Sequence, residues 1–360
     1  MTSAAAPAGA PGRLAIGVSV RRVTRTGWLV VAGLVVLVLV FIAGIVLGSV
    51  DLPPATTIGI IANRLGFHVP VTWPPTSEAI VMDLRLPRVL SAMAVGLGLA
   101  VAGATFQGLL RNPLADPYVL GTASGAALGA AIAVIIPARG LFLQFGLINA
   151  LAFIGALLSV TVVYRLSRKS ALAPLTSLLL TGYAVGSLLA AGLAMAMYLS
   201  GSGLRQIFAY LLGGFDGTSW ARLAVALPLI LGGSALILLR ARSLNGFLLG
   251  EEAAAHLGVD VRRERAILLG LASLVTAAGV AVAGLIGFVG LVIPHFVRLL
   301  VGPNARLVIP ISALFGASLL AAADVVARML GGIPVGVITA VIGAPFFLLL
   351  LRRARTGYEL

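Results

Sequence analysis

The stretch WLVVAGLVVLVLVFIAGIVLGSV at 28–50 is apolar for more than twenty residues and decides the class of fold. A hydrocarbon core of about 30 Å is crossed by about 20 apolar helical residues, so this stretch is long enough to span a membrane. A secretory signal core is shorter, about 7–15 residues, and is followed by a small-residue cleavage site. No such site follows this stretch, so we expect a retained first span.

Apolar stretches of similar length recur along the rest of the chain. Hydrophobic residues make up 60% of the sequence and charged residues 10%, against about 45–50% and about 25% in soluble domains. Too few polar side chains remain to cover a soluble surface. Further spans are predicted near 86–110, 118–137, 141–164, 173–199, 221–240, 266–287, 308–329 and 334–351, with a short tenth at 288–302. The predicted fold class is therefore an all-α polytopic membrane protein with about ten transmembrane helices.

The basic residues are distributed as membrane topology requires. With ten spans and the N-terminal tail inside, 18 of the 25 Lys and Arg residues fall on the inner side, as the positive-inside rule predicts. Nine spans would place the C-terminal arginines outside. We expect a multi-pass protein of the cytoplasmic membrane with both termini in the cytoplasm. The net charge of +14 does not indicate a nucleic-acid partner, because the basic residues punctuate apolar runs and do not cluster on a polar face.

The segments between the spans are too short to form a further domain. The predicted organisation is a flexible cytoplasmic tail at 1–26, a membrane domain at 27–352 and a cytoplasmic tail at 353–360. The longest other connections, 51–84 and 241–265, lie below the roughly 40 residues that a domain needs to fold alone. The only lysine, Lys169, has no glycine-rich loop before it, which excludes ATP hydrolysis through a Walker loop. The chain has no cysteine, and its three histidines lack metal-ligand spacing, so no metal site, cofactor or catalytic residue is expected.

Two segments of the sequence resemble each other. VAGATFQGLLRNP at 101–113 and VAGLIGFVGLVIP at 282–294 share Val-Ala-Gly, then Phe-x-Gly-Leu, then proline. In the predicted topology the first runs inward and the second outward. This arrangement favours an inverted internal repeat, which is common in transporters. The alternative is chance similarity between helices rich in glycine and alanine.

Two inner segments carry signals for local structure. In RNPLADP at 111–117, Asp116 followed by Pro117 predicts a capped helix start. In LNGFLLGEEAAAHLGVDVRRER at 244–265, Glu251 and Glu252 open a short helix that Gly258 ends. Asp260 can start another helix. Two short helices on the inner face would form a knob for a partner, whereas the simpler alternative is a solvated connector.

On the outer side, Arg85 and Arg88 flank the start of the second span. Because an arginine within hydrocarbon costs about 2.5–3.5 kcal/mol on insertion scales, both are expected at the membrane interface. Arg328 lies four residues after Asp324 near the outer end of the ninth span, so the two can pair within one helix. A role towards a partner is equally compatible with the sequence.

Several of these motifs together resemble one family. The motifs, in order along the chain, are RLPR at 85–88, QGLLRNPLADPYVLG at 107–121, LGEEAAAHLGV at 249–259, GFVGLVIPHFVR at 287–298, ADVVAR at 323–328 and IPVGVITAVIGAPFF at 333–347. The chain closely resembles the FecCD-type permeases, the membrane subunits of ABC importers for iron–siderophore complexes, haem and cobalamin. The resemblance implies a non-enzymatic permease, usually a homodimer, served by two separate ATPase subunits and a soluble substrate-binding protein.

The resemblance also assigns roles to residues. It implies ATPase coupling by Glu251, Glu252, Ala255 and Gly258, docking of the binding protein by Arg85, Arg88 and Arg328, and a cytoplasmic gate at Asn112, Leu114, Leu175 and Thr176. It further implies that the fifth span, with its Gly, Ala and Met face, lines the pathway. The segment LLGGFDGTSW at 211–220 matches the family only loosely.

Two other classes of membrane protein need residues that the sequence largely lacks. An ion-coupled secondary transporter could show inverted repeats, but it would need buried carboxylates, and the predicted spans offer almost none apart from Asp324. A membrane enzyme would need clustered acidic, histidine or serine chemistry, which the sequence does not show. By family frequency a ferric siderophore is the first expectation for the cargo, followed by haem and cobalamin.

Overall fold

The computed structural model describes residues 12–136, 146–168 and 174–355, which form helices and connections without a strand. Within these described ranges, ten apolar helices correspond in order to the ten predicted spans. They are α1 (Gly12–Val46), α4 (Leu86–Leu109), α5 (Thr122–Ile135), α6 (Leu147–Ser167), α7 (Pro174–Leu199), α9 (Trp220–Leu239), α12 (Val261–Ala283), α13 (Val289–Val301), α14 (Ala305–Met329) and α15 (Val335–Arg355). The predicted all-α polytopic fold is confirmed.

Helix α5 is shorter than its predicted span, whereas α13 is short, as predicted. Among the described residues, seven helices are long and apolar enough to cross a membrane, while α5, α13 and the apolar part of α15 are shorter. The 14 residues of α5 rise only about 21 Å at 1.5 Å per residue. The predicted helix start at Asp116–Pro117 is wrong, because residues 117–121 form a turn and Gly121 has a φ of +75°. Asp116 instead accepts a hydrogen bond from the Tyr118 N–H, 2.8 Å away.

The N-terminal tail is another correction. Helix α1 begins at Gly12, so residues 12–26, predicted to be flexible, are helical. This segment has no apolar periodicity and gave no signal of its own, but extending an existing helix costs far less than nucleating one. Residues 1–11, the other part of that predicted tail, lie outside the described residues, as does the end of the chain after Arg355.

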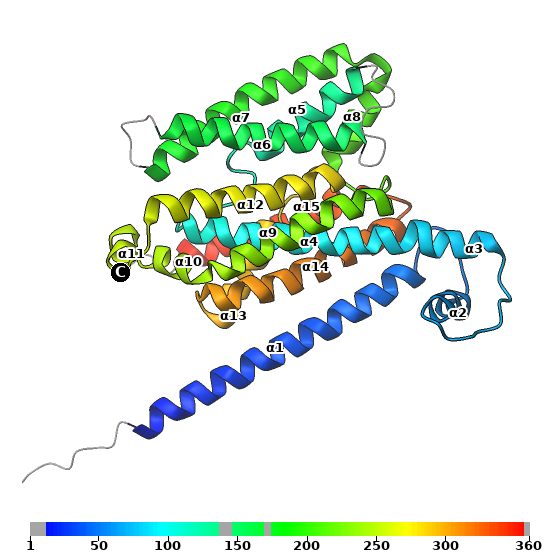
Figure 1. Ribbon diagram of the computed structural model, residues 1–360, viewed down its shortest axis with the longest axis horizontal. Coiled ribbons are helices and arrows are strands. Elements are labelled where there is room, and N and C mark those ends of the chain that lie inside the picture. The colour runs from blue at the N-terminus through cyan, green and yellow to red at the C-terminus, as the bar shows by residue number, and fades with distance from the viewer. Residues whose placement is uncertain (1–11, 137–145, 169–173, 356–360) are drawn as a thin grey trace, which may run out of the picture.

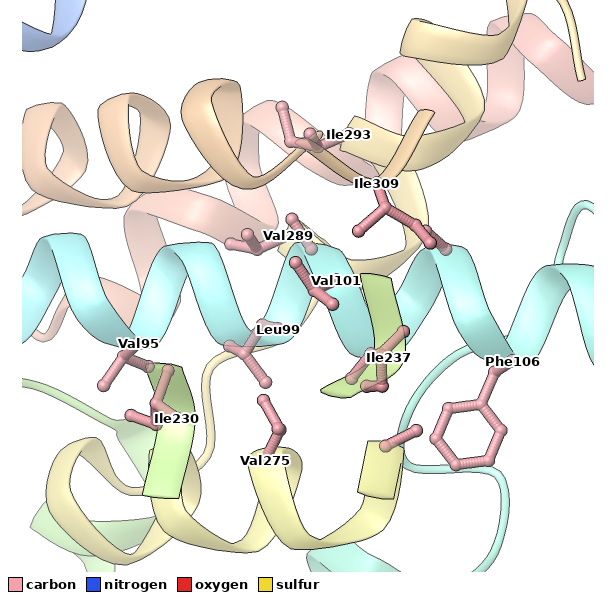
Figure 2. Close-up of a cluster of buried hydrophobic side chains, with 14 of the residues drawn as sticks. Val95, Leu99, Val101, Phe106, Ile230, Ile237, Val275, Val289, Ile293 and Ile309 are labelled. Atoms are coloured by element: carbon pink, nitrogen blue, oxygen red, sulfur yellow. The ribbon is translucent and has the colours of Figure 1, made fainter. Parts of the chain in front are cut away.

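Helix α4 runs through the centre of the molecule. Its neighbours α9, α12, α13 and α14 surround it, and Figure 2 shows buried side chains such as Ile230, Val275 and Val289 packed around it, beside its own Leu99. Two crossings bring backbones into contact. A Cβ on Gly96 would lie 2.2 Å from the carbonyl oxygen of Gly316, and one on Gly103 would lie 1.8 Å from that of Gly290. Helices in lipid associate through close approaches of this kind.

The remaining helices lie around this core. In Figure 1, α5, α6, α7 and α8 (Leu204–Leu212) form a layer on one side, and α1 lies obliquely along the other. At one end of the molecule, the connection after α1 forms α2 (Pro54–Arg64), α3 (Pro75–Ala79) and the π-helix η1 (Ile80–Arg85), which runs directly into α4. At the opposite end lie the short helices α10 (Ala241–Leu248) and α11 (Glu251–His256).

The two sequence copies take different local structures. Residues 101–109 remain in α4, whereas residues 282–294 include the end of α12, a break at 284–288 and the start of α13. At the level of whole elements, however, α4–α7 and α12–α15 both run long, short, long, long. The inverted repeat remains a prediction that this order favours.

Candidate functional site: an ionic cluster and a short helical segment

The end of the core that was predicted to face outwards contains a buried carboxylate shared by two arginines. Asp324 on α14 is fully buried. Its Oδ1 lies 2.8 Å from Arg88 NH2, and its Oδ2 lies 3.1 Å from Arg328 Nε. The Arg88 Nε–H also donates to both carboxylate oxygens. The predicted pairing of Asp324 with Arg328 is confirmed, and the structure adds Arg88 from α4.

Arg85 and Arg328 converge on the C-terminal end of α1. The Arg85 guanidinium donates to the carbonyls of Ile45 and Val46, at 2.8 and 2.6 Å, and to that of Val50. Arg328 donates to the carbonyls of Leu47 and Gly44, at 2.9 and 3.0 Å. The last carbonyls of a helix lack intrahelical donors and carry partial negative charge. The two arginines, 4% and 7% exposed, therefore cap α1 and attach it to the core.

The third arginine has an accessible partner. Arg88 NH1 lies 2.6 Å from Oδ1 of Asp216, whose side chain is 78% exposed. Asp216 belongs to the connection 213–219 between α8 and α9, and Phe215 beside it is buried. The Trp220 indole N–H donates to the Met82 carbonyl of η1 at 2.9 Å. These two contacts join the connection and the start of α9 to the entry of α4, beside a cavity of 180 Å³ lined by Tyr210, Gly214, Asp216 and Pro334 among others.

At the opposite end, the predicted short helices are present with one difference. Glu251 and Glu252 open α11, and Gly258 has a φ of +80° just after its end, as expected. Asp260 caps a helix by accepting from the Arg263 N–H at 3.0 Å, but that helix is the long span α12. The second short helix is α10, which precedes α11.

Helix α11 presents a mixed surface outwards. Glu252, Ala255 and Gly258 are exposed, while Ala254 is buried against the protein. Leu249 and Leu257, on either side of the helix, are 68% and 66% exposed. Glu251 forms an ion pair with Arg265 of α12. The segment 249–258 is therefore attached on one side and offers apolar and acidic side chains on the other.

The predicted gate residues lie in the turn after α4 and at the start of α7. Asn112 and Leu114 are exposed in the turn after α4, and the Asn112 side chain accepts a hydrogen bond from the Leu114 N–H at 2.9 Å. In the same turn, burial raises the pKa of Asp116 to about 6. Thr176 is exposed in the first turn of α7. The Leu175 side chain lies outside what the structure describes, as do residues 169–173 of the predicted gate loop. The gate therefore stays a prediction.

Sequence reasoning missed three polar contacts between elements. Asp216 lay in a segment with little family signal, and only its distance to Arg88 identifies it. Asn245 of α10 contacts the start of α14, which no local pattern indicates. Buried Gln107 accepts from Arg298 NH1 at 2.7 Å and donates to the Leu291 carbonyl at 3.0 Å, which ties α4 to α13. The motifs that contain Gln107 and Arg298 were recognised in the sequence, but the pairing of these two residues was not.

Comparison with known proteins identifies the family of this chain. The model of the FecCD transport family matches residues 16–353. This chain belongs to that family. The cobalamin import permease BtuC of Halobacterium salinarum is 47% identical, covering 83% of this chain and 79% of its own length. The hemin transport permease HmuU of Yersinia pestis is 43% identical, covering 77% and 84%.

A solved structure gives the same result for the fold. It is described as an inward-facing conformation of a metal-chelate type ABC transporter, and it matches with a TM-score of 0.72 and 31% identity over 83% of this chain and 98% of its own. The chain is accordingly a multi-pass membrane protein and the permease subunit of an ABC importer. ATP hydrolysis belongs to a separate subunit.

Proposed function

We propose that this permease carries a metal chelate across the cytoplasmic membrane as a homodimer, with both termini in the cytoplasm, two ATPase subunits inside and a substrate-binding protein outside. The proposal rests on two surfaces that lie at opposite ends of one helical core. One end offers the exposed segment 249–258, and the other offers an ionic cluster with one accessible arginine. Family membership supports the assignment of these ends to the two partners.

The cargo we favour is a corrinoid or haem-type chelate. Sequence reasoning placed ferric siderophores first, but the relatives that are named for a cargo include cobalamin permeases at 38–47% identity and a hemin permease at 43%. Uptake of cobalamin, hemin and a ferric siderophore into proteoliposomes that contain the whole importer distinguishes the three. Preferential uptake of the siderophore would overturn this choice.

The dimer and the pathway are proposed from the exposure of α7. Only 11% of the most apolar 18-residue stretch of α7 is buried, against 83% of the corresponding stretch in the span that contains α4. Tyr183 and Tyr198 on α7 are 79% and 85% exposed. Two such helices facing each other would form a pathway, and Asn112, Leu114, Leu175 and Thr176 would close it on the cytoplasmic side. Crosslinking through a cysteine introduced at Tyr198 tests the pairing in a chain that has no cysteine of its own.

Partner recovery tests the proposal as a whole. Affinity purification of the permease from its native membrane, followed by mass spectrometry, should recover an ATPase with a Walker loop in about equal amount. A retained binding protein can then be screened for its chelate. Repeated recovery of the permease alone in mild detergent would count against this assembly.

Removing the acidic start of α11 should uncouple transport. Glu251→Ala combined with Glu252→Ala removes the Glu251–Arg265 ion pair and an exposed carboxylate that a docking groove would contact. We expect ATP-driven uptake to fall about tenfold, as when polar contacts worth about 1.4 kcal/mol are lost at an interface. Uptake by the reconstituted importer is the measurement.

The matched control removes one exposed and one half-buried acid at the other end of the molecule. Asp51→Ala with Glu78→Ala changes the net charge equally and should leave uptake near the wild-type value. If the α11 variant transported as well as this control, the coupling role of Glu251 and Glu252 would be wrong.

Neutralising Asp216 should strengthen docking of the binding protein. Arg88 is the proposed docking arginine that keeps an accessible side, and Asp216 occupies that side at 2.6 Å. A carboxylate from the binding protein must displace it. Exposed ion pairs are weak, so Asp216→Asn should tighten binding by about threefold, mainly through the association rate.

Binding kinetics at several salt concentrations measure this effect. Asp83→Asn is the control, since Asp83 is also exposed and lies near Arg88 in sequence, whereas the ion-pair partners of Arg88 among the described residues are Asp216 and Asp324. Weaker binding after Asp216→Asn would mean that the binding protein contacts Asp216 directly and would contradict the competition.

A further inference from the structure

Helix α14 connects the two ends of the molecule. Its 25 residues extend about 37 Å at 1.5 Å per residue. It begins beside α10 at the inner end, and it ends with Asp324 and Arg328 in the outer ionic cluster. A displacement of its inner end would therefore reach the residues that hold Arg88 and the end of α1.

Asn245 of α10 holds the inner end of α14. Its Oδ1 accepts a hydrogen bond from the Ala305 N–H at 2.7 Å, and its Nδ2 donates to Asn304 Oδ1 at 2.9 Å. Asn304 is the N-cap of α14 and accepts from the Arg306 N–H at 3.1 Å. Asn245 thus supplies a cap from another helix to an N–H that α14 itself leaves without a partner.

The first turn of α14 depends on these caps more than an ordinary turn would. Pro310 lies inside the helix and has no N–H to donate back to the preceding turn. The turn 305–309 is therefore held by fewer backbone bonds. Capping by Asn304 and Asn245 compensates for this loss and ties the turn to α10.

Helix α10 is packed against α11. The two segments approach closely at Gly246 of α10. A Cβ added to this glycine would lie 3.5 Å from the side chains of Ala254 and Val259, which is ordinary van der Waals distance. Leu244 and Phe247 are buried in the core. A force applied to α11 therefore reaches α10 directly, and the polar link from α10 to α14 is Asn245.

We infer that Asn245 is a positioning residue that transmits movement of the segment 249–258 to α14, and through α14 to the outer ionic cluster. This inference rests on the proposed docking of ATPase subunits to that segment. It requires no direct contact of Asn245 with cargo or nucleotide. Removing the link should leave ATPase docking and ATP hydrolysis intact while lowering the uptake obtained per ATP.

The test uses the complete importer reconstituted in proteoliposomes with Asn245→Ala. Loss of a helix cap costs an amount equivalent to about a fivefold change in an equilibrium constant. We expect uptake per ATP hydrolysed to fall about fivefold, with ATPase binding unchanged. Asn304→Ala, at an exposed position, removes one of the two hydrogen bonds of Asn245 and should lower the same ratio. The two losses should not add fully in the double variant, because both variants remove the Asn245–Asn304 contact.

A structural readout separates this inference from the proposed function. Spin labels on Leu84→Cys and Met329→Cys, both exposed, report the outer ends of the span containing α4 and of α14. Nucleotide should change their distance distribution in the wild-type background and not with Asn245→Ala. Arg242→Ala, an exposed change on α10, is the control and should behave as wild type.

The outcomes are distinct. A wild-type response by Asn245→Ala in both the uptake ratio and the spin-label distance would overturn the inference. Equal losses of uptake and ATP hydrolysis, with the ratio unchanged, would also overturn it, since they indicate lost docking. If the wild-type complex showed no ATP-driven uptake of any chelate, the proposed function would fail instead.

Discussion

Asp324→Ala is expected to destabilise the permease by about 3–5 kcal/mol, the cost of leaving buried charges without their partner. Asp324 is fully buried, and its carboxylate pairs with both Arg88 and Arg328. Without it, two guanidinium groups remain close together in the core with no buried counter-charge. Both arginines also hold other elements, so the loss should loosen the end of α1 as well. Thermal unfolding in mild detergent is the measurement.

A surface pair provides the control for this variant. Arg64 and Glu78 are also paired, at 2.7 Å, but their side chains are 62% and 33% exposed. Glu78→Ala should therefore cost about 0–1 kcal/mol. An Asp324→Ala protein that melts with the Glu78→Ala protein would show that the cluster is not a buried ionic network.

Asp324→Asn addresses the remaining rival class of transporter. This variant keeps the shape of the side chain and removes the charge. An ion-coupled carrier that used Asp324 would lose uptake with ATP hydrolysis unaffected. In an ABC permease the variant should instead lose stability, and the two activities should decline together, because Asp324 is held by two arginines and has a structural role.

Among substitutions that add a single methyl group to the core, Gly103→Ala should destabilise the permease most. Its Cβ would lie 1.8 Å from the carbonyl oxygen and 2.6 Å from the carbonyl carbon of Gly290. Both atoms are backbone, so no side-chain rotation relieves the clash and α4 must separate from α13. Overpacking of a core costs about 1–3 kcal/mol, occasionally more, and we expect the upper end. The yield of folded protein and its melting temperature measure this.

Gly270→Ala is a matched control, and its expected effect on stability has the opposite sign. Gly270 lies inside helix α12, and nothing lies within 4 Å of an added Cβ. Alanine is favoured over glycine in a helix interior by about 0.5–1 kcal/mol. The control should therefore be as stable as the wild type or slightly more so. Similar melting of the two variants would contradict the close crossing of α4 and α13.

Family motifs predicted the identity of several site residues but not their contacts. RLPR and ADVVAR marked Arg85, Arg88, Asp324 and Arg328 on segments more than 200 residues apart. The sequence indicated only the local pair Asp324–Arg328. That Arg85 and Arg328 bind the end of α1 depends on how three helices meet, and helix positions in space are not encoded in local periodicity.

Helix boundaries show the same division. Apolar runs and glycines correctly predicted ten apolar helices, the short helix after Gly250 and its end before Gly258. They did not predict α10, which lies at the edge of a polar connection, or the late start of α5. Helix α5 is covered by neighbouring helices, so protein contacts replace the lipid contacts that a full-length span needs.

The sequence by itself determined that this is an all-helical membrane permease of the FecCD family, because hydrophobic length, charge distribution and motif order are properties of the chain. Tertiary structure alone decided which polar groups act together. Asp216 reaches Arg88, Asn245 reaches the start of α14, and Gln107 reaches Arg298, across sequence separations of 128, 60 and 191 residues. Such pairings follow from the packing of apolar faces and glycine crossings, which place distant polar side chains within hydrogen-bonding distance.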